Sequence, residues 1–133
     1  MLIGLNEYGI VNTDKPFIYT RDLSTCVVLI LHRENDAVFM HIESFNDFIR
    51  FEYLFHDIKF IDVFKSQYTR DSDLENIIRF LDNNIFQYEI NDVFVNYSNS
   101  TSVCYDYNYH KYYMFCDNYF IEREKGSVLR LEL

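Results

Sequence analysis

The run Cys26–Leu31, Cys-Val-Val-Leu-Ile-Leu, is continuously apolar and rich in β-branched side chains. This pattern predicts a strand that is buried on both faces, because a half-exposed strand would alternate apolar and polar residues. The polar stretch Arg33–Asp36 follows, and Ala37–Ile42 is again largely apolar. We therefore predict an antiparallel hairpin with strands near 26–32 and 37–42.

The residues before and after this hairpin predict further strands and two helices. Ser44 with Asp47 resembles a helix cap, and apolar residues follow it at roughly helical spacing. Ser72 with Glu75 matches a capping box, which predicts a second helix near residues 72–83. Strand-like patterns occupy the remaining segments, at Leu2–Val11, Phe17–Thr20, Ile58–Phe64, several arms from Phe86 onward, and Ser127–Leu133.

These elements predict an α+β fold, a largely antiparallel β-sheet sandwich with about two flanking helices. Hydrophobic residues make up 49% of the 133 residues, which is enough for a substantial core. One Pro and three Gly leave little room for a flexible linker. We therefore interpret residues 1–133 as a single domain.

The formal net charge of −9 excludes several classes of partner. Binding to nucleic acid or to anionic lipid needs clustered Lys and Arg, so neither is expected. A protein partner with a basic surface is compatible with the charge. No apolar run is long enough for a membrane helix, and the N-terminus lacks the features of a signal peptide. Three cysteines, an odd number, favour a reducing compartment: the cytoplasm, or export into a host cell without a cleaved signal.

The predicted hairpin brings a thiol and an imidazole together. If the loop is centred between Arg33 and Glu34, Cys26 lies directly opposite His41, and a shift of one residue leaves them diagonal on the same face. An imidazole can take the proton of a thiol and produce the nucleophilic thiolate. The competing interpretation is a core cysteine, because cysteine is among the most buried residue types.

Thr20, the stretch Leu23–Cys26 (Leu-Ser-Thr-Cys) and His41 resemble a pattern found in Cys–His protein glutamine deamidases. That group includes the chemoreceptor glutamine deamidase, the cytotoxic necrotizing factors and the lethal-factor deamidase toxins. In the family a Thr precedes the Cys by six positions, and the His follows on the next strand. The resemblance covers residues 20 to 42.

The resemblance implies a hydrolase of the bacterial effector or toxin type, with a mixed α/β sandwich fold. Cys26 would attack the carboxamide of a protein glutamine, His41 would act as base and then acid, and Thr20 would orient His41. No metal or organic cofactor is implied. The family carries Gly within the two residues before the Cys, where this chain has Ser24 and Thr25. The alternative is therefore a catalytically inactive, acidic, Tyr-rich interaction module or immunity-type protein.

The other candidate residues carry weaker signals. We interpret Cys104 and Cys116 as two buried thiols, with a cross-strand disulfide as the next possibility and a zinc site with Asp106 or Asp117 as the least favoured. His32 is expected to be exposed beside the hairpin turn, and His56 to follow a helix end. The stretch Tyr105–Tyr113 fits a binding face or a core face equally well.

Overall fold

The computed structural model describes the backbone in the ranges 1–21, 23–93, 95, 101–116, 119–124 and 127–132, and side chains as far as Tyr113. Its strands form two mixed sheets. The six-stranded sheet has the order β1 (Leu2–Ile3), β3 (Phe17–Thr20), β8 (Thr101–Asp106), β9 (Lys111–Cys116), β10 (Tyr119–Glu124) and β11 (Ser127–Glu132). The five-stranded sheet has the order β2 (Glu7–Val11), β5 (Ala37–Ile42), β4 (Val27–Arg33), β6 (Ile58–Ser66) and β7 (Tyr88–Val93).

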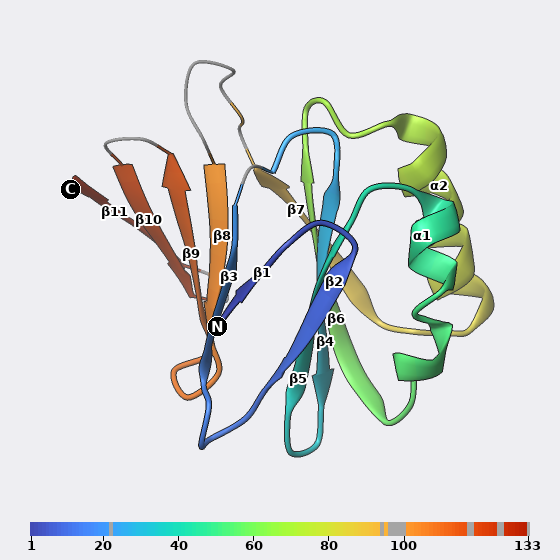
Figure 1. Cartoon of the computed structure of the whole chain (residues 1–133), viewed down its shortest axis with the longest axis horizontal. Helices are drawn as coiled ribbons and strands as arrows, with labels where there is room; N and C mark the ends of the chain where they lie inside the picture. Colours follow the sequence, from blue (N-terminus) through green and yellow to red (C-terminus); the bar gives the residue numbers. More distant parts are fainter. Residues whose placement is uncertain (22, 94, 96–100, 117–118, 125–126, 133) are drawn as a thin grey trace.

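The two sheets and the helices form three layers (Figure 1). The short helix α1 (Phe45–Ile49), the 3₁₀ turn Glu52–Leu54 and helix α2 (Asp71–Asn83) lie on the outer face of the five-stranded sheet. The six-stranded sheet covers the other face. Most pairings are antiparallel, and β1–β3 and β6–β7 are parallel. The expected α+β, sheet-rich fold is confirmed.

The central strand β4 contributes to both hydrophobic layers, as its apolar run predicts. Val28 and Ile30 belong to the core between the sheets, and Leu29 and Leu31 to the core beneath the helices. Burying an apolar side chain of this size contributes about 1.5–3 kcal/mol, so the two layers together fix this strand at the centre of the domain.

The N-terminal segment differs from the single strand predicted at Leu2–Val11. It forms two strands, β1 and β2, which belong to different sheets. Asn6 adopts a left-handed backbone conformation between them, with φ of 57°. Asparagine tolerates this conformation better than most residues, and it allows the chain to cross from one sheet to the other.

Both helices are present, but only one of the two predicted caps is correct. Ser44 caps α1 and accepts a hydrogen bond from the Asp47 N–H. Helix α2 begins at Asp71, so Ser72 lies inside its first turn and the Ser72–Glu75 capping box is wrong. Asp73 in that turn accepts a hydrogen bond from the Phe45 N–H instead, which joins the two helices.

The aromatic β8–β9 hairpin supplies mainly core residues. Tyr105 and Tyr112 are buried between the sheets, whereas Tyr109 in the turn is 69% exposed. Cys104 is a buried free cysteine that lies opposite Tyr113 in the ladder. Cys116 pairs instead with Thr101, so the two cysteines are three ladder positions apart and the cross-strand disulfide is not formed. Asp117, named above as a possible zinc ligand, lies outside the described residues. In the part of the chain that the structure describes, no helix is long and apolar enough to cross a membrane.

Candidate active site

Cys26 and His41 lie on the same face of the five-stranded sheet, as predicted, but not directly opposite one another. The β4–β5 ladder pairs Val28 with His41 and Val27 with Ile42. Continuing this register places Cys26, one residue before β4, beside Glu43 and diagonal to His41. The direct opposition is wrong because the tight turn closes with the Arg33 N–H donating to the Asp36 carbonyl, which moves the loop centre one residue along the chain.

Thr20 reaches His41 from the facing sheet. Its Oγ1 lies 2.7 Å from His41 Nδ1 and 2.9 Å from the carbonyl oxygen of Ile3. The hydroxyl has one hydrogen and must donate it to the carbonyl, so it accepts a hydrogen bond from Nδ1–H. Neutral His41 therefore carries its hydrogen on Nδ1 and its lone pair on Nε2. Thr20 is fully buried and His41 is 2% exposed, which holds both side chains in one arrangement.

The backbone of His41 is also held by the turn between β1 and β2. The Asn6 N–H donates to the His41 carbonyl at 2.6 Å. The Asn6 side-chain oxygen accepts a hydrogen bond from the Glu43 N–H at 3.1 Å. The left-handed Asn6 thus connects the N-terminal turn to the end of β5.

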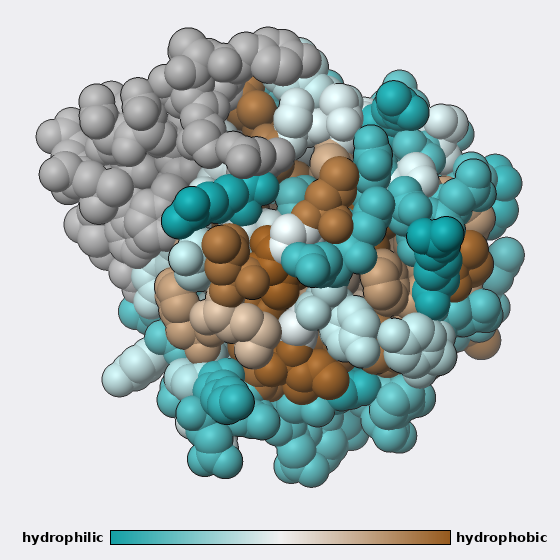
Figure 2. All heavy atoms as spheres, viewed as in Figure 1, coloured by the Kyte–Doolittle hydropathy of each residue, from teal (hydrophilic) through white to brown (hydrophobic). Residues whose placement is uncertain are grey.

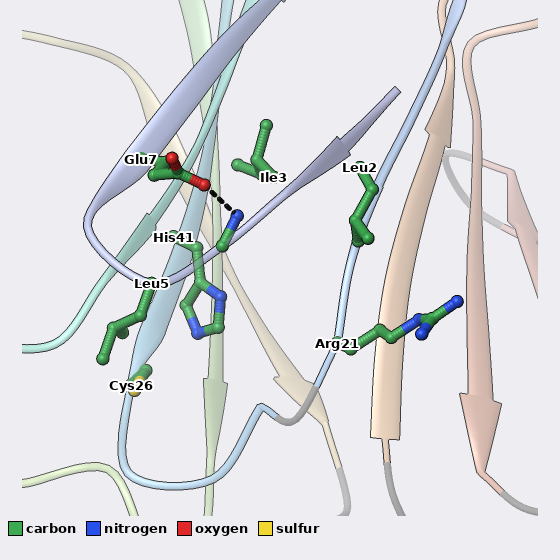
Figure 3. A pocket seen from close by; sticks show the side chains of 8 residues that line it. Leu2, Ile3, Leu5, Glu7, Arg21, Cys26 and His41 are labelled. Atoms are coloured by element: carbon green, nitrogen blue, oxygen red, sulfur yellow. Dashed lines mark hydrogen bonds between the residues drawn. The ribbon is translucent and has the colours of Figure 1, made fainter.

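A pocket of about 530 Å³ opens over this pair (Figure 3). Cys26 and His41 lie near each other beside Leu5, and the Arg21 side chain points away from them. Glu7 lines the far side and accepts a hydrogen bond from the Gly4 N–H. The full lining is Leu2, Ile3, Gly4, Leu5, Glu7, Arg21, Cys26 and His41.

The rim of the pocket is apolar and partly open to solvent. Figure 2 shows apolar side chains gathered on the face where β1 and β2 lie in Figure 1. Leu2 is 51% exposed and Leu5 is 46% exposed, and both line the pocket. An apolar rim around a polar pair suits a site that excludes water once a larger molecule covers it.

Opposing influences act on the Cys26 thiol. Burial raises the pKa of Cys26 most strongly, and the negative charge of Glu43 raises it further. Hydrogen bonds from the Thr25 side chain and the Ser24 backbone lower the pKa, but the net shift is upward. The raised pKa keeps Cys26 as a thiol at rest, and the thiolate must be generated by transfer of this proton to a base.

The two residues before Cys26 need no glycine. Positive φ at non-glycine residues occurs in the described chain at Asn6, Asp57, Ile85 and His110. Ser24 and Thr25 are absent from this group, so neither has the left-handed backbone that glycine would favour. The Thr25 hydroxyl contributes a hydrogen bond to the thiol that glycine could not make.

Sequence reasoning missed three residues around Cys26. Glu43 raises the pKa of the Cys26 thiol because the observed hairpin register brings it beside Cys26. The apolar pattern of the two strands could not predict this register. Ser66 and Thr69, more than forty residues later in the chain, donate hydrogen bonds to the backbone carbonyls of Ser24 and Cys26. An isolated Ser or Thr at or just after the end of a strand does not indicate, in a single sequence, which distant backbone carbonyl it will bind.

His32 is not the exposed turn residue that we expected. Its Nε2 lies 2.7 Å from a carboxylate oxygen of Asp62 and 3.0 Å from the Tyr112 hydroxyl, which also donates to Asp62. Burial, and then the Asp62 charge, raises the pKa of Tyr112. This network joins the two sheets at the other end of β4 from Cys26, and a prediction limited to the hairpin could not see it. His56 follows the Glu52–Leu54 turn, as expected.

Among the described residues, no group of three or more His, Cys, Asp or Glu side chains is arranged to hold a metal ion. No known protein family and no curated protein matches the chain.

Proposed function

We propose that this protein is a cysteine-dependent amidohydrolase that deamidates glutamine in another protein. The observation that carries the proposal is the hydrogen-bond relay from His41 Nδ1–H to Thr20 and from Thr20 to the Ile3 carbonyl. This relay directs the basic lone pair of His41 to Nε2, in a ring that lines the same pocket as Cys26. A base must be oriented by a third group to activate a weak nucleophile, and Thr20 has this role here.

The chemistry starts from the protonated thiol of Cys26. His41 Nε2 takes the Cys26 proton as the sulfur attacks the carboxamide carbon, and the carboxamide oxygen becomes an oxyanion. The imidazolium then gives its proton to the departing amide nitrogen, which leaves as ammonia. Water, deprotonated by His41, hydrolyses the thioester to glutamate and restores the thiol. The overall reaction consumes one water and needs no metal or organic cofactor.

The surroundings of the pocket support a protein substrate. Its half-exposed leucines would be covered by a docked protein, which would desolvate the pair and strengthen the interactions within it. The net charge of −9 favours a substrate with a basic surface. We place the reaction in the cytoplasm of the producing cell, or of a host cell reached by export without a cleaved signal.

One observation favours the alternative, a catalytically inactive interaction or immunity-type module. Cys26 is only 7% exposed, and its pKa is raised. A purely structural thiol would have both properties. In that case the acidic surface and the apolar rim would bind a basic partner without converting it.

Incubation of candidate basic proteins with the wild type, followed by mass spectrometry for glutamine converted to glutamate and an ammonia assay, separates the two functions. Cys26→Ser and His41→Ala should each abolish conversion with the fold retained, because the pair acts as a unit. Thr20→Ala should reduce conversion less, since it only loosens the imidazole. Conversion that persists in Cys26→Ser would refute the mechanism, and tight binding without conversion, unchanged in both variants, would establish the interaction module.

A further inference from the structure

The segment that carries Cys26 is attached to a distant part of the chain. Ser66 is the last residue of β6, and Thr69 lies between β6 and α2. Ser66 Oγ donates to the carbonyl oxygen of Ser24, and Thr69 Oγ1 donates to the carbonyl oxygen of Cys26 at 3.1 Å. The two backbone carbonyls on either side of Thr25 are therefore each held by a hydroxyl group.

These hydroxyl groups are themselves oriented by backbone N–H groups. The Tyr68 N–H donates to Ser66 Oγ at 3.0 Å, and the Ser66 N–H donates to Thr69 Oγ1 at 2.9 Å. Each hydroxyl thus accepts one hydrogen bond and directs its single hydrogen toward the Cys26 segment. Ser66 is 1% exposed and Thr69 is 8% exposed, so water competes little with either bond. A buried network in which these groups are satisfied is rigid.

We call these two hydrogen bonds, from Ser66 and Thr69 to the Ser24 and Cys26 carbonyls, the clamp. The position of Cys26 outside the sheet explains why the clamp matters. His41 lies within β5 and is paired on both sides, with Glu7 of β2 and Val28 of β4. Cys26 precedes β4, and the ladders of β4 with both neighbours end at Val27. The base is therefore fixed by the sheet, whereas the nucleophile lies one residue beyond it.

We propose that Ser66 and Thr69 are positioning residues, whose hydroxyls clamp the backbone around Cys26 and so hold its thiol in the pocket that His41 also lines. The inference rests on the proposed function only in that His41 acts as the base for Cys26. The two residues touch no reacting atom and act through the backbone of the nucleophile. Without the clamp, the thiol would move relative to the ring, and the imidazole would lose its effect on thiol reactivity.

A double-mutant cycle tests this role. The rate of Cys26 alkylation by chloroacetamide near neutral pH is measured by peptide mapping in the wild type and in Ser66→Ala/Thr69→Val, each with and without His41→Ala. The readout is the factor by which His41→Ala slows alkylation, because loosening the segment would also expose the sulfur and change the rate itself. This factor should be about tenfold in the wild type and below about twofold without the clamp.

Conservative variants provide the matched control. Ser66→Thr and Thr69→Ser keep a hydroxyl and should retain the effect of His41→Ala. Thr69→Val alone replaces the side chain by one of similar shape and serves if the combined variant does not fold. An undiminished His41 effect in the clamp-free protein would overturn the proposal while leaving the proposed function intact. If His41→Ala does not slow Cys26 alkylation when Ser66 and Thr69 are both present, the base role of His41 is refuted, and the proposed role of the clamp is refuted with it.

Discussion

Thr20 determines at the residue scale what His41 can do, because its only hydroxyl hydrogen is engaged by the Ile3 carbonyl. Spacing along the chain was enough to predict that Cys26 and His41 share a face, since side chains on a strand alternate with a period of two. The contact of Thr20 with His41 joins two different sheets, so no periodic pattern within one strand or hairpin could predict it. Only the family resemblance implied it. Glu43 escaped prediction because a one-residue change in loop centre moved it beside Cys26.

The neighbours of the thiol should shift its pKa in opposite directions. Glu43→Gln removes a negative charge that opposes the thiolate, so the pKa of Cys26 should fall and alkylation near neutral pH should accelerate. Thr25→Val removes a hydrogen bond that favours the thiolate, so the pKa should rise. For the same reason, we expect Thr25→Gly to slow the reaction rather than to repair a missing glycine. The measurement is the pH dependence of Cys26 alkylation.

Glu34→Gln is the matched control for the charge change, because Glu34 is an exposed residue at the opposite end of the hairpin, paired with Lys59. This substitution should leave the pH dependence of Cys26 alkylation the same as in the wild type. An equal shift in Glu34→Gln and Glu43→Gln would show that net charge, and not the local position of Glu43, governs the thiol.

At the scale of elements, the apolar run of β4 was sufficient to predict a doubly buried strand and its hairpin partner. Element ends were less predictable, because they depend on contacts between elements. Ser72 has the spacing of a cap, but α2 begins one residue earlier and uses Asp73 to bind α1. His32 is held by Asp62 and Tyr112 on other strands, far outside the local pattern.

Helix α2 packs on the face of the five-stranded sheet that points away from the pocket, so its contribution should be to stability alone. Leu81 is fully buried there. Leu81→Ala should lower the free energy of unfolding by about 2–5 kcal/mol, measured by urea denaturation. The His41 dependence of Cys26 alkylation should be unchanged in the folded variant. The exposed Glu75→Ala should change stability by less than about 0.5 kcal/mol.

A change in that His41 dependence caused by Leu81→Ala, under conditions where the protein is folded, would contradict this separation of the layers. Weak destabilisation, comparable to that of Glu75→Ala, would contradict the packing of α2 itself.

At the scale of the whole molecule, the hydrophobic patterns were enough to predict a sheet-rich α+β fold. They could not predict that the N-terminal segment contributes a strand to each sheet. That exchange is set by the turn at Asn6, and it brings Thr20, from the six-stranded sheet, against His41. The site therefore depends on how the two sheets face each other.

The core between the sheets should make the protein sensitive to alkaline pH. Burial raises the pKa of Cys104 to about 12. The folded protein thus holds this proton more tightly than the unfolded chain, whose thiols titrate near about 8.5. The resulting stabilisation is complete below the unfolded pKa and is lost as the pH rises toward about 12. Relative to Cys104→Ala, the wild type should lose about 2.7 kcal/mol between about pH 7 and about pH 10.5.

Urea unfolding at the two pH values measures this difference. Ser102→Ala, a substitution of a half-buried neighbour that does not titrate, should keep a constant difference from the wild type. A constant difference for Cys104→Ala as well would show that the Cys104 thiol has an ordinary pKa in the folded protein.

The base role of His41 toward Cys26 is tested most directly by the pH dependence of Cys26 alkylation by chloroacetamide in the folded wild type and in His41→Ala. Between about pH 6 and about pH 10, the wild-type rate should keep a plateau near neutrality, where the imidazole deprotonates the thiol. In His41→Ala the rate should follow only the raised titration of the thiol and be at least about tenfold lower near pH 7. Superimposable profiles, or faster labelling of Cys104 than of Cys26, would contradict the assignment of the pair.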